Sequence, residues 1–207
     1  MLFETEPEVT LTRALLSRRV ESLPALPVEP TGPLGDAFLA RGAIDLHDAI
    51  RVVRDLPFGR NSNPLDPATV LAEGRGTMSD KHVLLAALAR ELGNDELELV
   101  LGMVRMSAET HPSVGAALRS ARLESLPEAM IWLRWYGQDC DFSSMRAGAQ
   151  ELVVLQQEIL PLDRAARYPE LRHKDFLLRF LLVSRRDDLP DLKSLWALHE
   201  RCLDLVL

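Results

Sequence analysis

One segment limits what the chain can fold into more than any other: residues 78–92 read as a helix that is apolar on nearly all sides. Thr77, followed by Asp80 three residues later, provides a capping-box start. Gly93 stands where a helix-terminating glycine is expected. A helix that is apolar all round is buried in the middle of a domain. The fold must therefore surround this helix, and its first turn points into the interior.

Strand-like segments follow the helix. Residues 97–106 are apolar on both alternating faces, which predicts a central strand. Residues 128–136 predict a second strand, and Gly137 allows a turn into a short third strand at 139–142. We therefore expect a small antiparallel sheet.

Helical patterns lie on both sides of these strands in the sequence. The predicted helices cover residues 9–21, 45–56, 67–73, 149–160, 169–184 and 190–206. Helices, then a small sheet, then helices again is the order expected of an α+β fold.

A proline-rich stretch marks the one internal boundary. Between residues 24 and 33 a proline recurs every third residue, which matches the period of polyproline II. We interpret residues 22–34 as an extended strap that ties the N-terminal helix to the body, in preference to a PxxP ligand for an aromatic groove. The chain then divides into an N-terminal helix and strap at 1–44 and a main domain at 45–207.

Composition excludes several classes of protein. The 207 residues include 24 Lys+Arg and 31 Asp+Glu, a net charge of −7, which argues against a nucleic-acid partner because phosphates need a concentrated basic face. Two cysteines cannot build a disulfide framework, and the five histidines lack metal-ligand spacing, so we expect no cofactor and no metal. Without a signal peptide or a membrane-length apolar run, we expect a cytoplasmic protein with no membrane partner.

A series of segments begins at the buried helix and continues to the C-terminus. The segments are Gly74–Leu85, Leu126–Leu133 and Tyr136–Ser143, supported by Asp55–Arg60, His173-Lys174 and Leu195–Cys202. In order and spacing they resemble the transglutaminase-like superfamily, in particular an uncharacterised prokaryotic branch, over roughly residues 45–207. The resemblance implies a papain-like fold with a catalytic cysteine at the start of the central helix, a histidine on the facing strand and an acid on the next strand.

The positions that the resemblance makes catalytic are altered. Met78 occupies the nucleophile position and Met130 the base position, and only Asp141, at the acid position, keeps its expected type. A thioether has no proton to lose, and it cannot act as a base. The resemblance therefore implies a pseudoenzyme, and we lean against enzymatic activity.

Two non-catalytic functions are open. In the first, the degenerate cleft binds a peptide or protein through Met78, His82, Met130, Trp132 and Asp141, because methionine-rich surfaces adapt to many ligands. In the second, the methionines fill the cleft, and the chain is a purely structural partner protein. The sequence does not determine the oligomeric state.

A third possibility is a hydrolase or acyltransferase with a relocated nucleophile. Cys140 is one candidate, although it should face away from Asp141 on a strand. Ser79 and His82 form another, because residues three apart on a helix can touch. Asp141 also has a purely structural interpretation, as the partner of Arg134 in a cross-strand ion pair.

Overall fold

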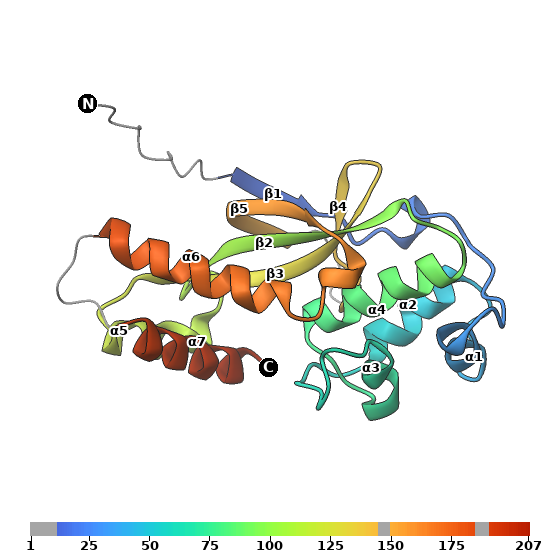
Figure 1. Ribbon diagram of the computed structural model, residues 1–207, viewed down its shortest axis with the longest axis horizontal. Helices are drawn as coiled ribbons and strands as arrows, with labels where there is room; N and C mark the ends of the chain where they lie inside the picture. Colours follow the sequence, from blue (N-terminus) through green and yellow to red (C-terminus); the bar gives the residue numbers. More distant parts are fainter. Residues whose placement is uncertain (1–11, 145–149, 185–190) are drawn as a thin grey trace.

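The computed structural model describes residues 12–144, 150–184 and 191–207. Within these ranges five strands form one sheet in the order β1-β5-β2-β3-β4, and neighbouring strands are antiparallel (Figure 1). The strands are β1 (Thr12–Leu16), β2 (Leu97–Ser107), β3 (Ser125–Trp135), β4 (Gln138–Cys140) and β5 (Gln150–Leu160). The helices are α1 (Pro33–Leu39), α2 (Leu46–Asp55), α3 (Ala68–Glu73), α4 (Met78–Glu91), α5 (Gly115–Ser120), α6 (Tyr168–Ser184) and α7 (Leu192–Val206). Short 3-10 turns lie at Val20–Ser22, Pro112–Val114 and Leu162–Arg164. The fold is α+β, as the sequence predicted.

The two edges of the sheet meet. Just beyond β1, Ser17 forms a parallel bridge with Cys140 at the end of β4. The Ser17 N–H donates to the carbonyl of Asp139, and the Asp141 N–H donates to the carbonyl of Ser17, both at 2.8 Å. Because β1 and β4 are the opposite edge strands, these bonds roll the sheet into a small, partly closed barrel.

The inside of the roll is filled by strand residues alone. Its buried members are Ala14, Leu16, Val100, Val104, Trp132, Leu152 and Val154, which we call the barrel cluster. Trp132 is fully buried, and Gly102 on the neighbouring strand leaves room for it, since a Cβ at Gly102 would lie 2.1 Å from the indole ring. A glycine in a central strand here marks a close approach by a large ring.

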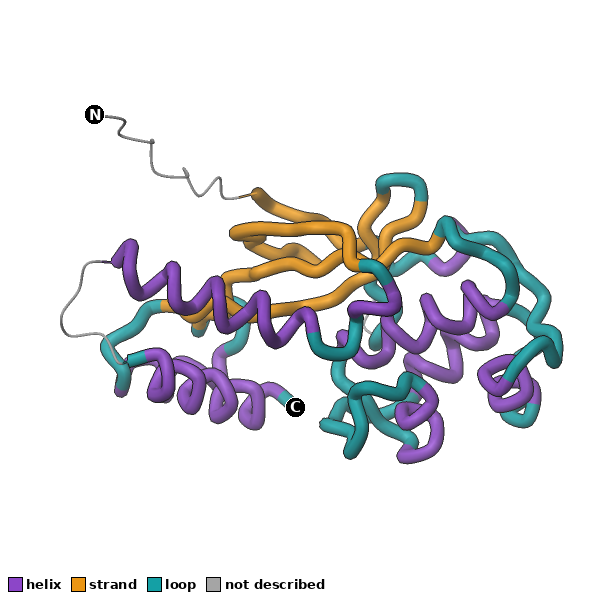
Figure 2. Tube along the Cα trace, in the orientation of Figure 1, coloured by secondary structure: helices purple, strands orange, loops and turns teal. Residues whose placement is uncertain are grey.

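Helices pack against the sheet in two groups. Figure 2 shows α1 to α4 gathered near one end of the sheet and α5 to α7 near the other. The first group shares the main core with Leu99 and Leu101 of β2 and with Leu133 of β3. The second group surrounds Met106 and Leu126. Among the described helices, none is long and apolar enough to cross a membrane.

The predicted central helix is confirmed as α4. The capping box at Thr77 and Asp80 is present, and Gly93 has a φ of +79° beyond the end of the helix. Leucine and alanine side chains of α4 are buried on several sides, but so are Lys81 and His82. The helix is therefore central, yet it carries two buried polar side chains that must be satisfied from outside the helix.

Two predicted helices are wrong, because these segments are strands. The helix predicted at 9–21 is replaced by β1 and a 3-10 turn, and residues 9–11 lie outside the described chain. The helix predicted at 149–160 is replaced by β5 over Gln150–Leu160, and residue 149 lies outside the described chain. Both strands pair with each other, and β5 also pairs with β2. Leu, Gln and Glu favour helices locally, but this long-range pairing overrides that preference.

The other predicted helices and strands are confirmed with shifted bounds. The turn at Tyr136-Gly137 has φ of +45° and +77°, a pair of positive values that suits a two-residue hairpin turn. β4 ends at Cys140, so Asp141 lies just outside the strand. The strap runs from Leu23 to α1, and it is held by a bridge between Pro27 and Asp45. The helices α1 and α5 were not predicted.

We predict that Gly102→Ala destabilises the protein by about 1–3 kcal/mol, the usual cost of overpacking a core. The reason is the 2.1 Å approach of a new Cβ to Trp132. Denaturant unfolding of Gly102→Ala, of Trp132→Leu and of the double variant checks this. A smaller side chain at 132 should relieve the clash, so the double variant should lose less than the sum of the two single losses. Additive losses would contradict the contact.

Candidate functional site

Met78, the residue that the resemblance assigns to the nucleophile position, lies at the N-terminus of the central helix. Met78 is the first residue of α4, directly after the N-cap residue Thr77. The Thr77 hydroxyl accepts a bond from the Asp80 N–H at 3.2 Å, and the Asp80 carboxylate accepts one from the Thr77 N–H at 2.9 Å. This reciprocal pair fixes the first turn of the helix. Met78 is half-buried and packs against the barrel cluster.

Met130, the residue that the resemblance assigns to the base position, lies beside the same cluster. Met130 and Trp132 are two residues apart on β3 and therefore share a face of the strand. Met130 is half-buried at the margin of the barrel cluster, as Met78 is. Trp132 is fully buried within it, and its indole Nε1 has no hydrogen-bond partner among the described residues. The structure thus brings together Met78, Met130 and Trp132.

His82 connects α4 to two strands. Its Nδ1 lies 2.9 Å from the carbonyl of Ile131 on β3, and its Nε2 lies 2.9 Å from the backbone nitrogen of Phe142 beyond β4. Leu133 pairs with Cys140, so Ile131 and Phe142 would be opposite each other two positions farther along the ladder. The imidazole occupies the place of that pair and bonds to both strands at once.

These partners determine the protonation state of the ring. A backbone N–H can only donate, so His82 Nε2 accepts from Phe142; a carbonyl can only accept, so Nδ1–H donates to Ile131. His82 is therefore the neutral Nδ1–H tautomer. Ser79, one turn earlier on the helix, accepts a bond from the Ile131 N–H at 3.0 Å. Both backbone groups of Ile131 are thus bonded to α4.

Asp141 is buried and fully engaged. It is 1% exposed. Arg18 donates to its Oδ2 from Nε at 2.9 Å and from a terminal nitrogen at 2.7 Å. Ser143 donates to its Oδ1 from the backbone N–H at 2.9 Å and from the hydroxyl at 2.6 Å. Burial by itself would raise the pKa of Asp141, but the hydrogen bonds that its carboxylate accepts, among them both bonds from Ser143, outweigh burial and hold the pKa well below its usual range.

The partner predicted for Asp141 is wrong. Arg134 pairs instead with Asp139, at 2.7 Å, because these two residues are directly opposite each other in the β3–β4 hairpin. Asp141 lies beyond the end of β4 and reaches Arg18, which follows the Ser17 bridge. Sequence spacing alone favours the nearer arginine, and only the closure of the roll brings Arg18 to this place.

The candidate relocated nucleophiles have other roles. The Cys140 side chain is fully buried in the main core, and burial raises the pKa of its thiol to about 12. It therefore remains a neutral thiol at physiological pH. His82 has both ring nitrogens bonded to backbone, so no nitrogen is free to activate Ser79.

Lys81 belongs to this site, although the sequence analysis did not select it. The side chain is fully buried, and Nζ donates to the carbonyls of Leu56 at 2.6 Å and Ser143 at 2.8 Å. It also lies 4.2 Å from the centre of the Phe58 ring. Burial lowers the pKa of Lys81 to about 8, against the opposing effect of Asp141. A lysine within an otherwise apolar helix was the signal that could have identified it.

A second polar cluster lies at the other end of β3. Glu128 of β3, His173 of α6 and His199 of α7 each offer a ligand atom, and these atoms all lie within 4.8 Å of one another. Burial lowers the pKa of His173. Burial also lowers the pKa of His199, but the Glu128 carboxylate outweighs that effect, so the pKa of His199 is raised. The sequence analysis missed this cluster because its members come from three distant elements.

The structure therefore sorts the predicted site residues into two groups. His82 and Asp141 lie together, 3.4 Å apart, in a hydrogen-bonded cluster. Met78, Met130 and Trp132 gather at the barrel cluster. Ile131 links the groups, because it lies between Met130 and Trp132 and bonds to α4. A scan of protein-family models and searches of curated proteins and of solved structures gave no match to the chain.

We predict that Asp141→Asn destabilises the protein by about 3–5 kcal/mol, the usual result of removing one partner from a buried ion pair. The change keeps the size of the side chain but leaves the largely buried Arg18 guanidinium without its counter-ion. Denaturant unfolding at neutral pH measures the loss. Glu151→Gln is the matched control, because its ion pair with Arg13 is exposed and should contribute at most about 1 kcal/mol. Equal losses in the two variants would contradict a special role for Asp141.

We also predict a dependence on pH that belongs to Asp141. Folding lowers the pKa of Asp141 from its ordinary value of 3.8. Its contribution to the free energy of unfolding is therefore complete when the pH is above that value, and it disappears as the pH falls toward the folded pKa. The difference in free energy of unfolding between wild type and Asp141→Asn should be constant above about pH 5 and should narrow below about pH 4. Unfolding curves at pH 7, 5 and 3 measure it, and a difference that widens at low pH would refute the assignment.

Proposed function

We propose that the chain is a catalytically degenerate transglutaminase-like protein that acts as a protein-binding or assembly module. The observation that carries this proposal is which residues occupy the three positions that the resemblance makes catalytic, and what those residues contact. Two of these positions are occupied by methionine. At the third, the Asp141 carboxylate accepts its hydrogen bonds from Arg18 and Ser143.

The arrangement of these positions supports the lineage. Met78 begins a buried helix, Met130 lies on the strand to which that helix bonds, and Asp141 follows the next strand of the hairpin. Both methionines contact the same apolar cluster. This is the relation among helix, strand and neighbouring strand that the superfamily uses for its nucleophile, base and acid.

The site chemistry favours a non-catalytic role. No thiolate is available at the start of α4, and the thiol of Cys140 has a pKa of about 12. The neutral imidazole of His82 is held by two backbone groups. A relocated nucleophile with an adjacent base, the alternative enzymatic function, therefore lacks support in this arrangement.

Exposed apolar side chains favour binding through the outer surface over binding in the old cleft. Met78 and Met130 are already packed against the barrel cluster. On α6, by contrast, Leu171 is 65% exposed and Leu182 is 69% exposed, with Leu178 between them. Spacings of seven and four residues place these three leucines on one side of the helix. Exposed apolar residues on one side of a helix can mark a surface for a protein partner.

The decisive experiment restores the proposed ancestral pair. In Met78→Cys/Met130→His, the thiol lies at the helix N-terminus, where unpaired N–H groups stabilise a thiolate, so we expect its pKa to fall from about 8.5 to below about 7.5. The pH profile of alkylation by iodoacetamide measures this pKa. The native thiols Cys140 and Cys202 are buried and should give little background.

Two controls separate activation from mere accessibility. Met78→Cys alone lacks the imidazole, and Ala72→Cys adds an exposed cysteine in the last turn of α3, away from any helix N-terminus. We expect the double variant to react at lower pH than both. A folded double variant that titrates like Ala72→Cys would overturn the proposed lineage of the site. Labelling of the folded wild type by thiol-directed or serine-directed acyl probes would overturn the non-catalytic role.

A further inference from the structure

The cluster of Glu128, His173 and His199 lies where the two C-terminal helices meet β3. We propose that these three side chains bind one divalent transition-metal ion, with zinc as the reference ion. The site is separate from the degenerate positions and from the proposed partner role. It would join α6 and α7 to the sheet through a single ion.

The three side chains are enclosed by the protein. His173 is 2% exposed, His199 is 4% exposed, and the side chain of Glu128 is 14% exposed. Their ligand atoms lie within 4.8 Å of one another. Tetrahedral zinc with bonds of about 2.0–2.1 Å requires ligand atoms about 3.3 Å apart, so shifts of about 1.5 Å or less would bring these atoms to that spacing.

The polar atoms facing the site lack proper partners. Glu128 Oε2 and His199 Nε2 are 2.5 Å apart. Even so, neither atom has a partner in hydrogen-bond geometry among the described residues, and the same is true of His199 Nδ1. Two groups this close, but not aligned along an N–H direction, do not satisfy each other. Buried polar groups without partners are costly, and an ion between them would remove that cost.

One ring nitrogen of His173 is engaged by the backbone, which leaves the other available as a ligand. Its Nε2 lies 2.9 Å from the carbonyl of Pro127, which can only accept, so Nε2 carries the proton and Nδ1 keeps its lone pair. Metal-bound histidines characteristically donate their other ring N–H to a carbonyl or carboxylate in this way. The other ring nitrogen of His199, Nδ1, lies 3.4 Å from a carboxylate oxygen of Glu200 but outside hydrogen-bond geometry.

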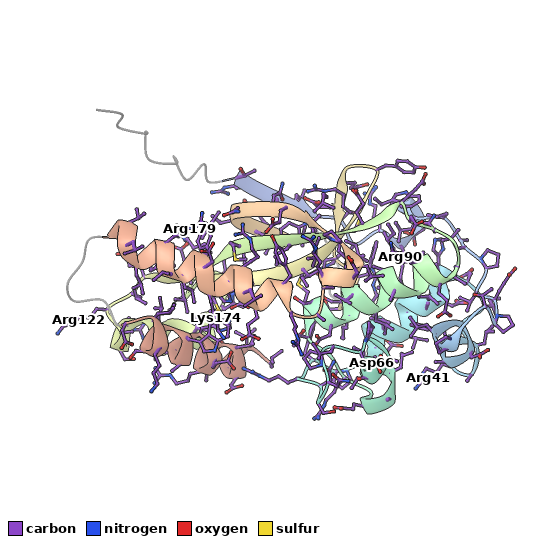
Figure 3. The ribbon with its side chains drawn as sticks, viewed as in Figure 1. Arg41, Asp66, Arg90, Arg122, Lys174 and Arg179 are labelled. Carbon is purple, nitrogen blue, oxygen red and sulfur yellow. The ribbon has the colours of Figure 1, made fainter. Side chains whose placement is uncertain are left out.

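Aromatic packing holds both imidazole planes. The His173 and His199 rings meet edge to face, with their centroids 4.5 Å apart. The Trp196 ring centroid lies 5.3 Å from that of His173 and 4.9 Å from that of His199. Lys174 covers the indole of Trp196 at 4.5 Å, and Figure 3 shows this lysine beside α7. Rings fixed by packing lose little freedom when an ion binds.

The donor set selects the class of ion. Two imidazoles and one carboxylate suit zinc and neighbouring transition metals, whereas calcium and magnesium prefer oxygen ligands alone. The carboxylate also needs a positive partner, and its one recorded ion pair within the described chain is with His199. A bound cation supplies that charge while both imidazoles remain neutral.

The test uses the full chain after treatment with a chelator. Titration with Co²⁺ should reach saturation at one equivalent, develop visible absorption bands of a low-coordinate ion, and lose them when Zn²⁺ is added. X-ray absorption of the zinc form should show nitrogen and oxygen ligands with two imidazoles. Zinc should also raise Tm, because it binds the folded state. The absence of saturable binding to the folded wild type, or sulfur in the coordination sphere, would overturn the proposal.

Variants locate the site. His199→Gln and Glu128→Gln should each weaken binding of Zn²⁺ at least about a hundredfold, since even outer-shell changes cost 10–100-fold. His47→Gln is the matched control, because His47 on α2 bonds to the carbonyl of Leu23, outside the cluster. Circular dichroism identifies the folded variants, and the wild-type spectra decide the question if both variants unfold. Unchanged affinity in a folded His199→Gln would place any bound ion elsewhere and refute the assignment.

Discussion

The bond network around Asp141 holds the two edges of the sheet together. Ser17 and Cys140 bridge β1 to β4, and the next residues along the chain, Arg18 and Asp141, form the buried ion pair. Asp141 then orients Ser143, whose carbonyl accepts from Lys81 on α4. A five-stranded barrel has little interior, so charged groups that close its seam compensate for apolar area it cannot bury. The roll and the central helix are thus joined by one polar cluster.

This network changes how we interpret Asp141, the residue that the resemblance assigns to the acid position. In an active enzyme of the resembling superfamily, the acid orients a histidine on the adjacent strand. Here the residue on that strand is Met130, and the nearby imidazole comes from His82 on the helix, already bonded to two backbone groups. The carboxylate serves an arginine and a serine instead. The bonds of Asp141 to Arg18 and Ser143 give this aspartate a structural role that does not depend on catalysis.

The sequence predicted those parts of the fold whose causes are local. The capping box, the all-round apolar pattern and Gly93 defined α4, and alternation with a positive-φ turn defined the β3–β4 hairpin. It failed at β1 and β5, because each is stabilised chiefly by pairing with strands distant in sequence. The partner of Asp141 was predicted incorrectly for the same reason. Arg134 was the nearest cation to Asp141 along the hairpin, and only the closed roll brings in Arg18, 123 residues away.

Strand β3 carries Glu128, Met130 and Trp132, and its backbone bonds to α4 at Ile131. Ile131 turns its backbone groups toward Ser79 and His82, so α4 is fixed at this point of the strand. Two residues on the same face, Met130 and Trp132, face the barrel cluster, while Glu128 meets the C-terminal helices. Because a strand is rigid along its length, the position of α4 and the spacing of the Glu128 cluster depend on the same backbone. A change that shifts the register of β3 by one residue would turn Trp132 out of the roll and remove Glu128 from the histidines together.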